Sequence, residues 1–131
     1  MESISTRVHS WLRDTIVEFG KALGEGPSEA LRRVAEEWWA MREFPAIEFR
    51  EGVTGRRAGL RSGPDVWEVI LVWRDYDPDR ERLYEHFGEH VPREHLDQAL
   101  AYYERFREEI DRRIAENERV AARLQARAGL R

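Results

Sequence analysis

The chain has 131 residues, of which 41% are hydrophobic and 37% charged, and its 26 acidic and 22 basic side chains give a net charge of −4. A membrane protein is excluded because no apolar run approaches the ~20 residues that span a bilayer. A disordered chain is excluded by the many aromatic residues, and the absence of cysteine excludes disulfides and thiolate metal sites. The N-terminal segment has no apolar signal core, so we expect a cytoplasmic protein.

Residues 3–8 alternate with the period of a β-strand. The two faces of this strand carry Ser3, Ser5 and Arg7 on one side and Ile4, Thr6 and Val8 on the other. Only helices are expected over the following 40 or so residues, so the simplest partner is the same strand of a second copy across a two-fold axis. Two alternatives stay open, namely a ribbon that only dimerises the protein and a disordered terminus.

Two helices are predicted after this strand, over residues 10–23 and 27–43, with a break at the glycines between them. A two-stranded ribbon fits the major groove of DNA, where Arg7 would contact guanine O6 and N7 and the small Ser3 and Ser5 would allow close approach. The start of the second helix, Gly26-Pro27-Ser28, would offer free backbone N–H groups to a phosphate.

The segment ISTRVHSWLRDTIVEFGKALGEGPSEALRRVAEEWW resembles the ribbon-helix-helix family of repressors and antitoxins. The resemblance covers about the first 43 residues and is carried by the strand alternation, the helix spacing, the break at Gly24 and the PSEALRR start of the second helix. It implies a homodimer in which Ser3, Ser5 and Arg7 read bases and residues 26–28 hold a phosphate. We therefore expect residues 1–44 to be a dimerisation and DNA-binding domain, followed by a second domain over residues 45–131.

The second domain is predicted to begin with a β-hairpin, with strands over residues 46–51 and 56–61 joined by a glycine-containing turn. Helices are expected over residues 64–76 and 78–87 and from 92 to about 127. Two short helices followed by a third across a tight turn outline a helix-turn-helix. The overall fold class expected is thus mainly α with short β elements.

This region resembles the domain-of-unknown-function family numbered 433, whose members are often antitoxins or antitoxin-like. The residues that carry the resemblance are Ile47-Glu48-Phe49, Gly55-Arg56-Arg57, Val66-Trp67-Glu68-Val69-Ile70 and LDQALAYY from Leu96 to Tyr103. The resemblance implies a homeodomain-like three-helix fold and a PIN-like ribonuclease toxin as partner, without catalysis. For Arg56 and Arg57 we expect exposed positions that pair with Glu48 or Glu51.

The last helix carries an apolar stripe that extends beyond what a three-helix domain needs. Such a stripe is expected to pack into a groove. The residues expected to contact the toxin are Ile110, Ile114, Asn117, Arg119, Val120, Arg123, Leu124 and Arg127. The arginines of this last helix would reach the acidic metal-binding site of the nuclease toxin. The alternative is that the stripe packs on its dimer mate, with Asn117 setting the register.

Other residues are of types that bind metals, but their positions in the sequence favour a structural role. His86, His90 and His95 are close in sequence, yet Gly88 interrupts the helix between the first two, so we predict no metal site. The acidic run over residues 75–79 is expected to cap a helix. No nucleophile–base pair and no phosphate-binding glycine loop is present, so no catalytic residue, cofactor or small-molecule substrate is expected.

The sequence thus favours the antitoxin of a type II toxin–antitoxin system, which binds operator DNA as a dimer and neutralises a PIN-like ribonuclease by occlusion. The alternative is a stand-alone transcriptional repressor. A metal-dependent nuclease built on the three histidines is the third hypothesis.

Overall fold

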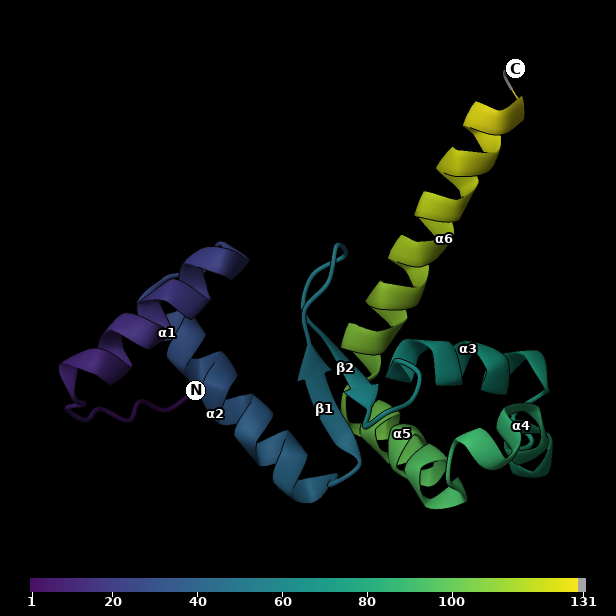
Figure 1. Ribbon diagram of the computed structural model, residues 1–131, viewed down its shortest axis with the longest axis horizontal. Helices are drawn as coiled ribbons and strands as arrows, with labels where there is room; N and C mark the ends of the chain where they lie inside the picture. The colour runs from purple at the N-terminus through teal and green to yellow at the C-terminus, as the bar shows by residue number, and fades with distance from the viewer. Residues whose placement is uncertain (130–131) are drawn as a thin grey trace.

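The computed structural model describes residues 1–129 and is mainly helical, with one short antiparallel hairpin and a long C-terminal helix (Figure 1). The elements in chain order are α1 (Ser10–Leu23), α2 (Pro27–Glu43), β1 (Ile47–Arg50), β2 (Arg57–Leu60), α3 (Val66–Asp75), α4 (Arg80–Phe87), the 3₁₀ turn η1 (Gly88–His90), α5 (Arg93–Arg105) and α6 (Arg107–Gly129). None of the helices within these residues is long and apolar enough to cross a membrane.

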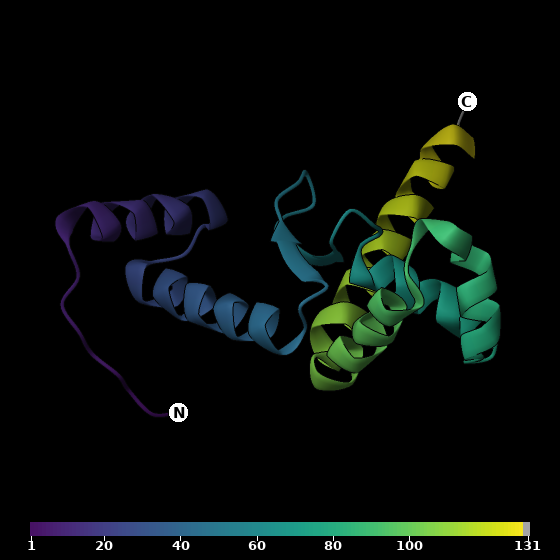
Figure 2. The same ribbon diagram turned by 60° about the horizontal axis from the view of Figure 1, so that its bottom comes forward.

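The first nine residues form no helix and no strand within this single chain, and all of them are exposed. Figure 2 shows this segment as an extended trace without a neighbouring strand. Because the predicted partner strand belongs to a second copy, the ribbon over residues 3–8 stays a prediction.

Helices α1 and α2 have the predicted bounds, and the turn between them explains why. Gly24 ends α1 in the left-handed region at φ 69°, which glycine adopts without strain. Pro27 occupies the first position of α2, where its missing N–H costs nothing. The chain packs closely at Gly20, where an added Cβ would lie 2.7 Å from the Glu25 carbonyl oxygen in the turn and 3.0 Å from the Ala30 Cβ on α2.

The main core lies in the second part of the chain, where the hairpin, α3, α4, α5 and the start of α6 meet. Strands β1 and β2 pair in the register Ile47↔Leu60 to Arg50↔Arg57, which confirms the predicted hairpin. The largest fully buried side chains are Tyr102, Ile47, Leu60, Ile70, Leu83, Leu96, Val66 and Val69. The end of α2 joins this core through Ala40, and Trp39 and Phe44 pack against it.

The prediction of one helix from residue 92 to about 127 is wrong, because the helix breaks at Phe106. The Phe106 backbone leaves the helical region at φ −126° and ψ 44°. Its ring packs on Tyr102, with centroids 4.6 Å apart, and edge-on against Trp39 at 6.1 Å. The bend allows both α5 and α6 to pack against α3, so tertiary packing overrides helix continuity.

Asp65 is the buried polar residue that joins the hairpin to α3. Its side chain takes part in a capping box with Glu68, and it pairs with Arg57 and with Arg50 Nε at 3.2 Å. Trp67 Nε1 donates to Asp65 Oδ2 at 3.2 Å. One carboxylate therefore stabilises the start of α3 and pairs with two arginines of the hairpin.

We expect Asp65→Ala to lower the free energy of unfolding by about 2–3 kcal/mol, because it removes a helix cap, deprives the half-buried Arg57 of its carboxylate and leaves Arg50 with the more distant Glu48. Urea denaturation of the full chain measures this. Asp65→Asn is the matched control, since it keeps a capping acceptor but loses the charge, and its loss should be smaller. Equal stability of Asp65→Ala and the parent chain would contradict this role.

Candidate functional site

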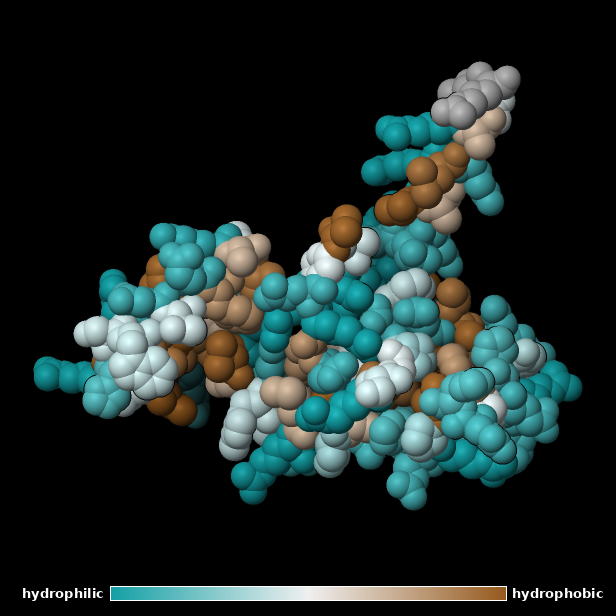
Figure 3. Space-filling view, in the orientation of Figure 1, coloured by the Kyte–Doolittle hydropathy of each residue, from teal (hydrophilic) through white to brown (hydrophobic). Residues whose placement is uncertain are grey.

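The α1–α2 hairpin leaves a row of large apolar side chains uncovered. Leu31, Val34 and Trp38 follow one another at helical spacing on α2 and are 45%, 42% and 59% exposed. Trp11 on α1 is 67% exposed. Figure 3 shows brown apolar atoms at the surface of this part of the molecule. Apolar side chains at these spacings typically form the buried face of a helix, so this face has the character of an interface.

The predicted base-reading residues Ser3, Ser5 and Arg7 are all exposed. The opposite face of the same segment is uncovered too, with Ile4 93% and Val8 43% exposed. Neither face of the segment is therefore buried by this chain, and its apolar side is available to a second copy.

The predicted phosphate-binding residues Gly26, Pro27 and Ser28 lie exposed at the start of α2. Glu25 is next to them, and Arg33 binds its carboxylate with Nε at 3.1 Å from both oxygens. The hydrogen bond from Arg33 lowers the pKa of Glu25 below its usual value. The negative charge beside this helix start is therefore compensated within the chain.

Arg56 connects the hairpin to both N-terminal helices. Its Nε and Nη2 each lie 2.6 Å from an oxygen of Glu37 on α2, and its guanidinium lies 5.0 Å from the Phe19 ring centroid on α1. The predicted partner Glu51 also pairs with Arg56, at 3.3 Å. The expected exposed position is wrong for Arg56, because its side chain is only 18% exposed.

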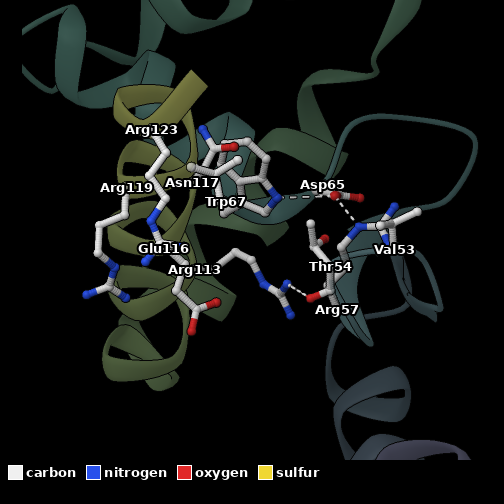
Figure 4. A pocket seen from close by; sticks show the side chains of 11 residues that line it. Val53, Thr54, Arg57, Asp65, Trp67, Arg113, Glu116, Asn117, Arg119 and Arg123 are labelled. Atoms are coloured by element: carbon white, nitrogen blue, oxygen red, sulfur yellow. Dashed lines mark hydrogen bonds and ion pairs between the residues drawn. The ribbon is translucent and has the colours of Figure 1, made fainter. Parts of the chain in front are cut away.

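A cavity of about 560 Å³ lies between the β1–β2 loop and α6 (Figure 4). Its lining is formed by Val53, Thr54, Arg57, Asp65, Trp67, Arg113, Glu116, Asn117, Arg119, Val120 and Arg123. Arg113 fixes the two walls together, because its guanidinium donates to the carbonyl oxygens of Thr54 and, at 2.9 Å, of Arg56. We call this cavity the loop–α6 groove.

The structure divides the predicted toxin-contacting residues into three groups. Asn117, Arg119, Val120 and Arg123 line the loop–α6 groove. Leu124 and Arg127 are exposed further along α6. Ile110 and Ile114 are only 3% and 4% exposed and belong to the core, so their side chains are not accessible to a partner. The sequence missed the other wall of the groove, which a loop remote in sequence supplies.

The three histidines do not assemble into a ligand set. Within residues 1–129 no group of three or more His, Asp or Glu side chains is placed to hold a metal ion. His86 Nδ1 instead lies 3.2 Å from the Tyr76 hydroxyl. Asp79 accepts hydrogen bonds from the backbone of Glu81 and Arg82, which confirms the expected helix cap.

Comparison of the chain with protein families, with curated proteins and with solved structures gives no match. The two family resemblances of the sequence therefore stay predictions.

Proposed function

We propose that the chain is the antitoxin of a type II toxin–antitoxin system, which binds operator DNA as a homodimer and neutralises a PIN-like ribonuclease by occlusion. The observation that carries this proposal is the uncovered apolar face of α1 and α2 beside an exposed segment that alternates Ser3, Ser5 and Arg7 with less polar residues. The buried residues of α1 and α2 are Gly20, Ala30, Glu37 and Ala40. A helical hairpin that buries so few side chains gains stability when a second copy covers it.

Dimerisation would also give hydrogen-bond partners to the backbone of the N-terminal segment. Paired with its twin, the segment over residues 3–8 would form an antiparallel ribbon with satisfied backbone groups. Ile4 and Val8 would then cover the helices. Arg7 would face outward on a two-stranded ribbon, which fits into the major groove of DNA. The exposed start of α2 would contact a phosphate on either side.

The α3–α5 unit is proposed as a protein-binding and positioning domain rather than as a second DNA reader. In a helix-turn-helix arrangement α5 would enter the groove, yet two of its polar side chains are already engaged within the chain. Asp97 accepts from Arg80 at 2.7 Å and from the Tyr84 hydroxyl, and Gln98 accepts from the Ala46 backbone N–H at 2.7 Å. Acidic side chains near the helix start further disfavour contact with phosphates.

The free end of α6 is proposed as the inhibitory element. Residues 115–129 are all exposed, and a single helix of this kind is marginally stable without a partner surface. Seated on the nuclease, its arginines would neutralise the acidic metal-binding site and its bulk would exclude RNA. A stand-alone repressor would lack this partner. If the chain were a metal-dependent nuclease, the isolated chain would cleave RNA in the presence of Mn²⁺ or Zn²⁺.

We expect Arg7→Ala to weaken binding to the DNA upstream of the protein's own reading frame by about 1–3 kcal/mol for each base that Arg7 reads. The melting temperature should not change, because Arg7 is exposed and its side chain makes no hydrogen bond or ion pair within residues 1–129. Fluorescence anisotropy with labelled duplex measures the affinity, and Arg82→Ala on α4 is the control. Unchanged affinity of Arg7→Ala would refute the assignment.

A further inference from the structure

The apolar stripe that anchors α6 to the core continues beyond the point where the core ends. Ile110 and Ile114 are buried, and the same four–three spacing continues through the polar Asn117 and the apolar Ala121 and Leu124, all of which are exposed. The stripe is therefore buried against the core at the base of α6 and uncovered along the free half of the helix. An uncovered continuation of a packing face indicates a surface completed by another molecule.

The loop–α6 groove gives this surface a second wall and a definite shape. Val53 at the tip of the β1–β2 loop is fully exposed, and Val120 opposite it is 47% exposed. Trp67 also lines the groove and is held by its hydrogen bond to Asp65 (Figure 4). Because Arg113 ties the loop to α6, the groove is formed before any partner arrives, which lowers the entropic cost of binding.

The lining of the loop–α6 groove carries more positive than negative side chains. Arg57 is compensated by Asp65, and Arg113 donates to backbone carbonyls. Arg119 and Arg123 have no ion pair within residues 1–129, and Glu116 is the one further carboxylate in the lining. Beyond Glu118, α6 carries arginines at a spacing of four and no acidic residue up to Gly129.

We propose that the loop–α6 groove binds an acidic segment of a partner protein, with an apolar side chain seated between Val53, Trp67 and Val120 and carboxylates paired with Arg119 and Arg123. Unpaired guanidinium groups at the rim favour carboxylates with fork geometry, and the exposed apolar side chains favour protein over DNA. A second copy in parallel is disfavoured because the arginine rows would lie side by side. The inference deepens the proposed function and rests on it only for the identity of the partner.

The groove is tested without any knowledge of the partner. The probe is a short synthetic amphipathic helix with leucine on one face and glutamate on the other, titrated into the ¹⁵N-labelled full chain. The chain has five tryptophans, and the indole N–H signal of Trp67, assigned with Trp67→Phe, reports on the groove directly. We expect this signal and those of Val53 and Val120 to shift, and a lysine version of the peptide to leave them unchanged.

Charge reversal provides the matched comparison. Arg119→Glu with Arg123→Glu should weaken peptide binding at least about tenfold. Arg13→Glu with Arg82→Glu changes the net charge equally on α1 and α4 and should have no effect. The inference is overturned if the acidic peptide does not bind, if both double variants behave alike, or if duplex DNA shifts the Trp67 signal instead. It is also overturned if the groove variants dissociate a dimer in analytical ultracentrifugation, since a second copy would then be the occupant.

Co-expression with the protein encoded by the neighbouring reading frame separates the groove from the antitoxin proposal. Neutralisation that survives the Arg119→Glu and Arg123→Glu changes would overturn the groove as the toxin site while leaving the antitoxin proposal intact. Peptide binding in the groove without any neutralisation would refute the antitoxin proposal alone.

Discussion

Truncation after Ala115 is expected to abolish neutralisation of the proposed nuclease partner and to leave the proposed operator binding unchanged. The removed segment is exposed along its whole described length, so the core stays complete. Ile110 and Ile114, which anchor the base of α6, are retained. Arg113 is retained as well and continues to hold the β1–β2 loop. The truncated chain should therefore keep its fold while losing most of the surface through which a partner would be occluded.

The measurement compares growth rescue on co-expression with the nuclease and, in parallel, DNA affinity by anisotropy. A truncation after Glu109 is the instructive contrast, because it also removes both buried isoleucines and should lower the melting temperature. Full rescue by the chain truncated after Ala115 would show that the inhibitory surface lies elsewhere. Loss of DNA binding by the same truncated chain would contradict the division of labour between the two ends of the protein.

Local signals in the sequence were sufficient for much of the fold. The bounds of α1 and α2 follow from a left-handed glycine and a proline at the first helical position, and both act within a few residues of the chain. The hairpin follows from alternation around a glycine-containing turn, and the structure confirms its pairing. These features depend on backbone conformation, which residue type restricts directly.

Features that depend on distant contacts were not predictable in the same way. The break at Phe106 involves neither proline nor glycine and follows from packing against Trp39, which lies on another helix. Arg56 finds its main partner in Glu37, remote in sequence, whereas the sequence offered only the nearer acids. The loop–α6 groove arises in the same manner, because its walls come from segments separated by the whole α3–α5 unit. Tertiary placement, rather than local propensity, decides such features.

Replacing Leu31 and Trp38 together by aspartate is expected to convert the protein to a monomer and to weaken operator binding at least about 100-fold. Each large apolar side chain that a second copy fully covers contributes about 1.5–3 kcal/mol, and the double variant removes two from each protomer. Buried carboxylates without partners would oppose association further. Since the ribbon over residues 3–8 would exist only in the dimer, base reading by Arg7 should be lost with it.

Analytical ultracentrifugation and anisotropy with operator duplex measure the two effects. The parent chain should also melt at a temperature that rises with protein concentration, whereas the variant should not, because dimer formation is linked to stability by mass action. Ala101→Asp with Ala115→Asp adds the same charge at exposed positions of α5 and α6 and should remain dimeric. A parent chain that is monomeric at every concentration, yet still binds DNA, would remove the two-fold ribbon from the explanation and with it the assigned roles of Ser3, Ser5 and Arg7.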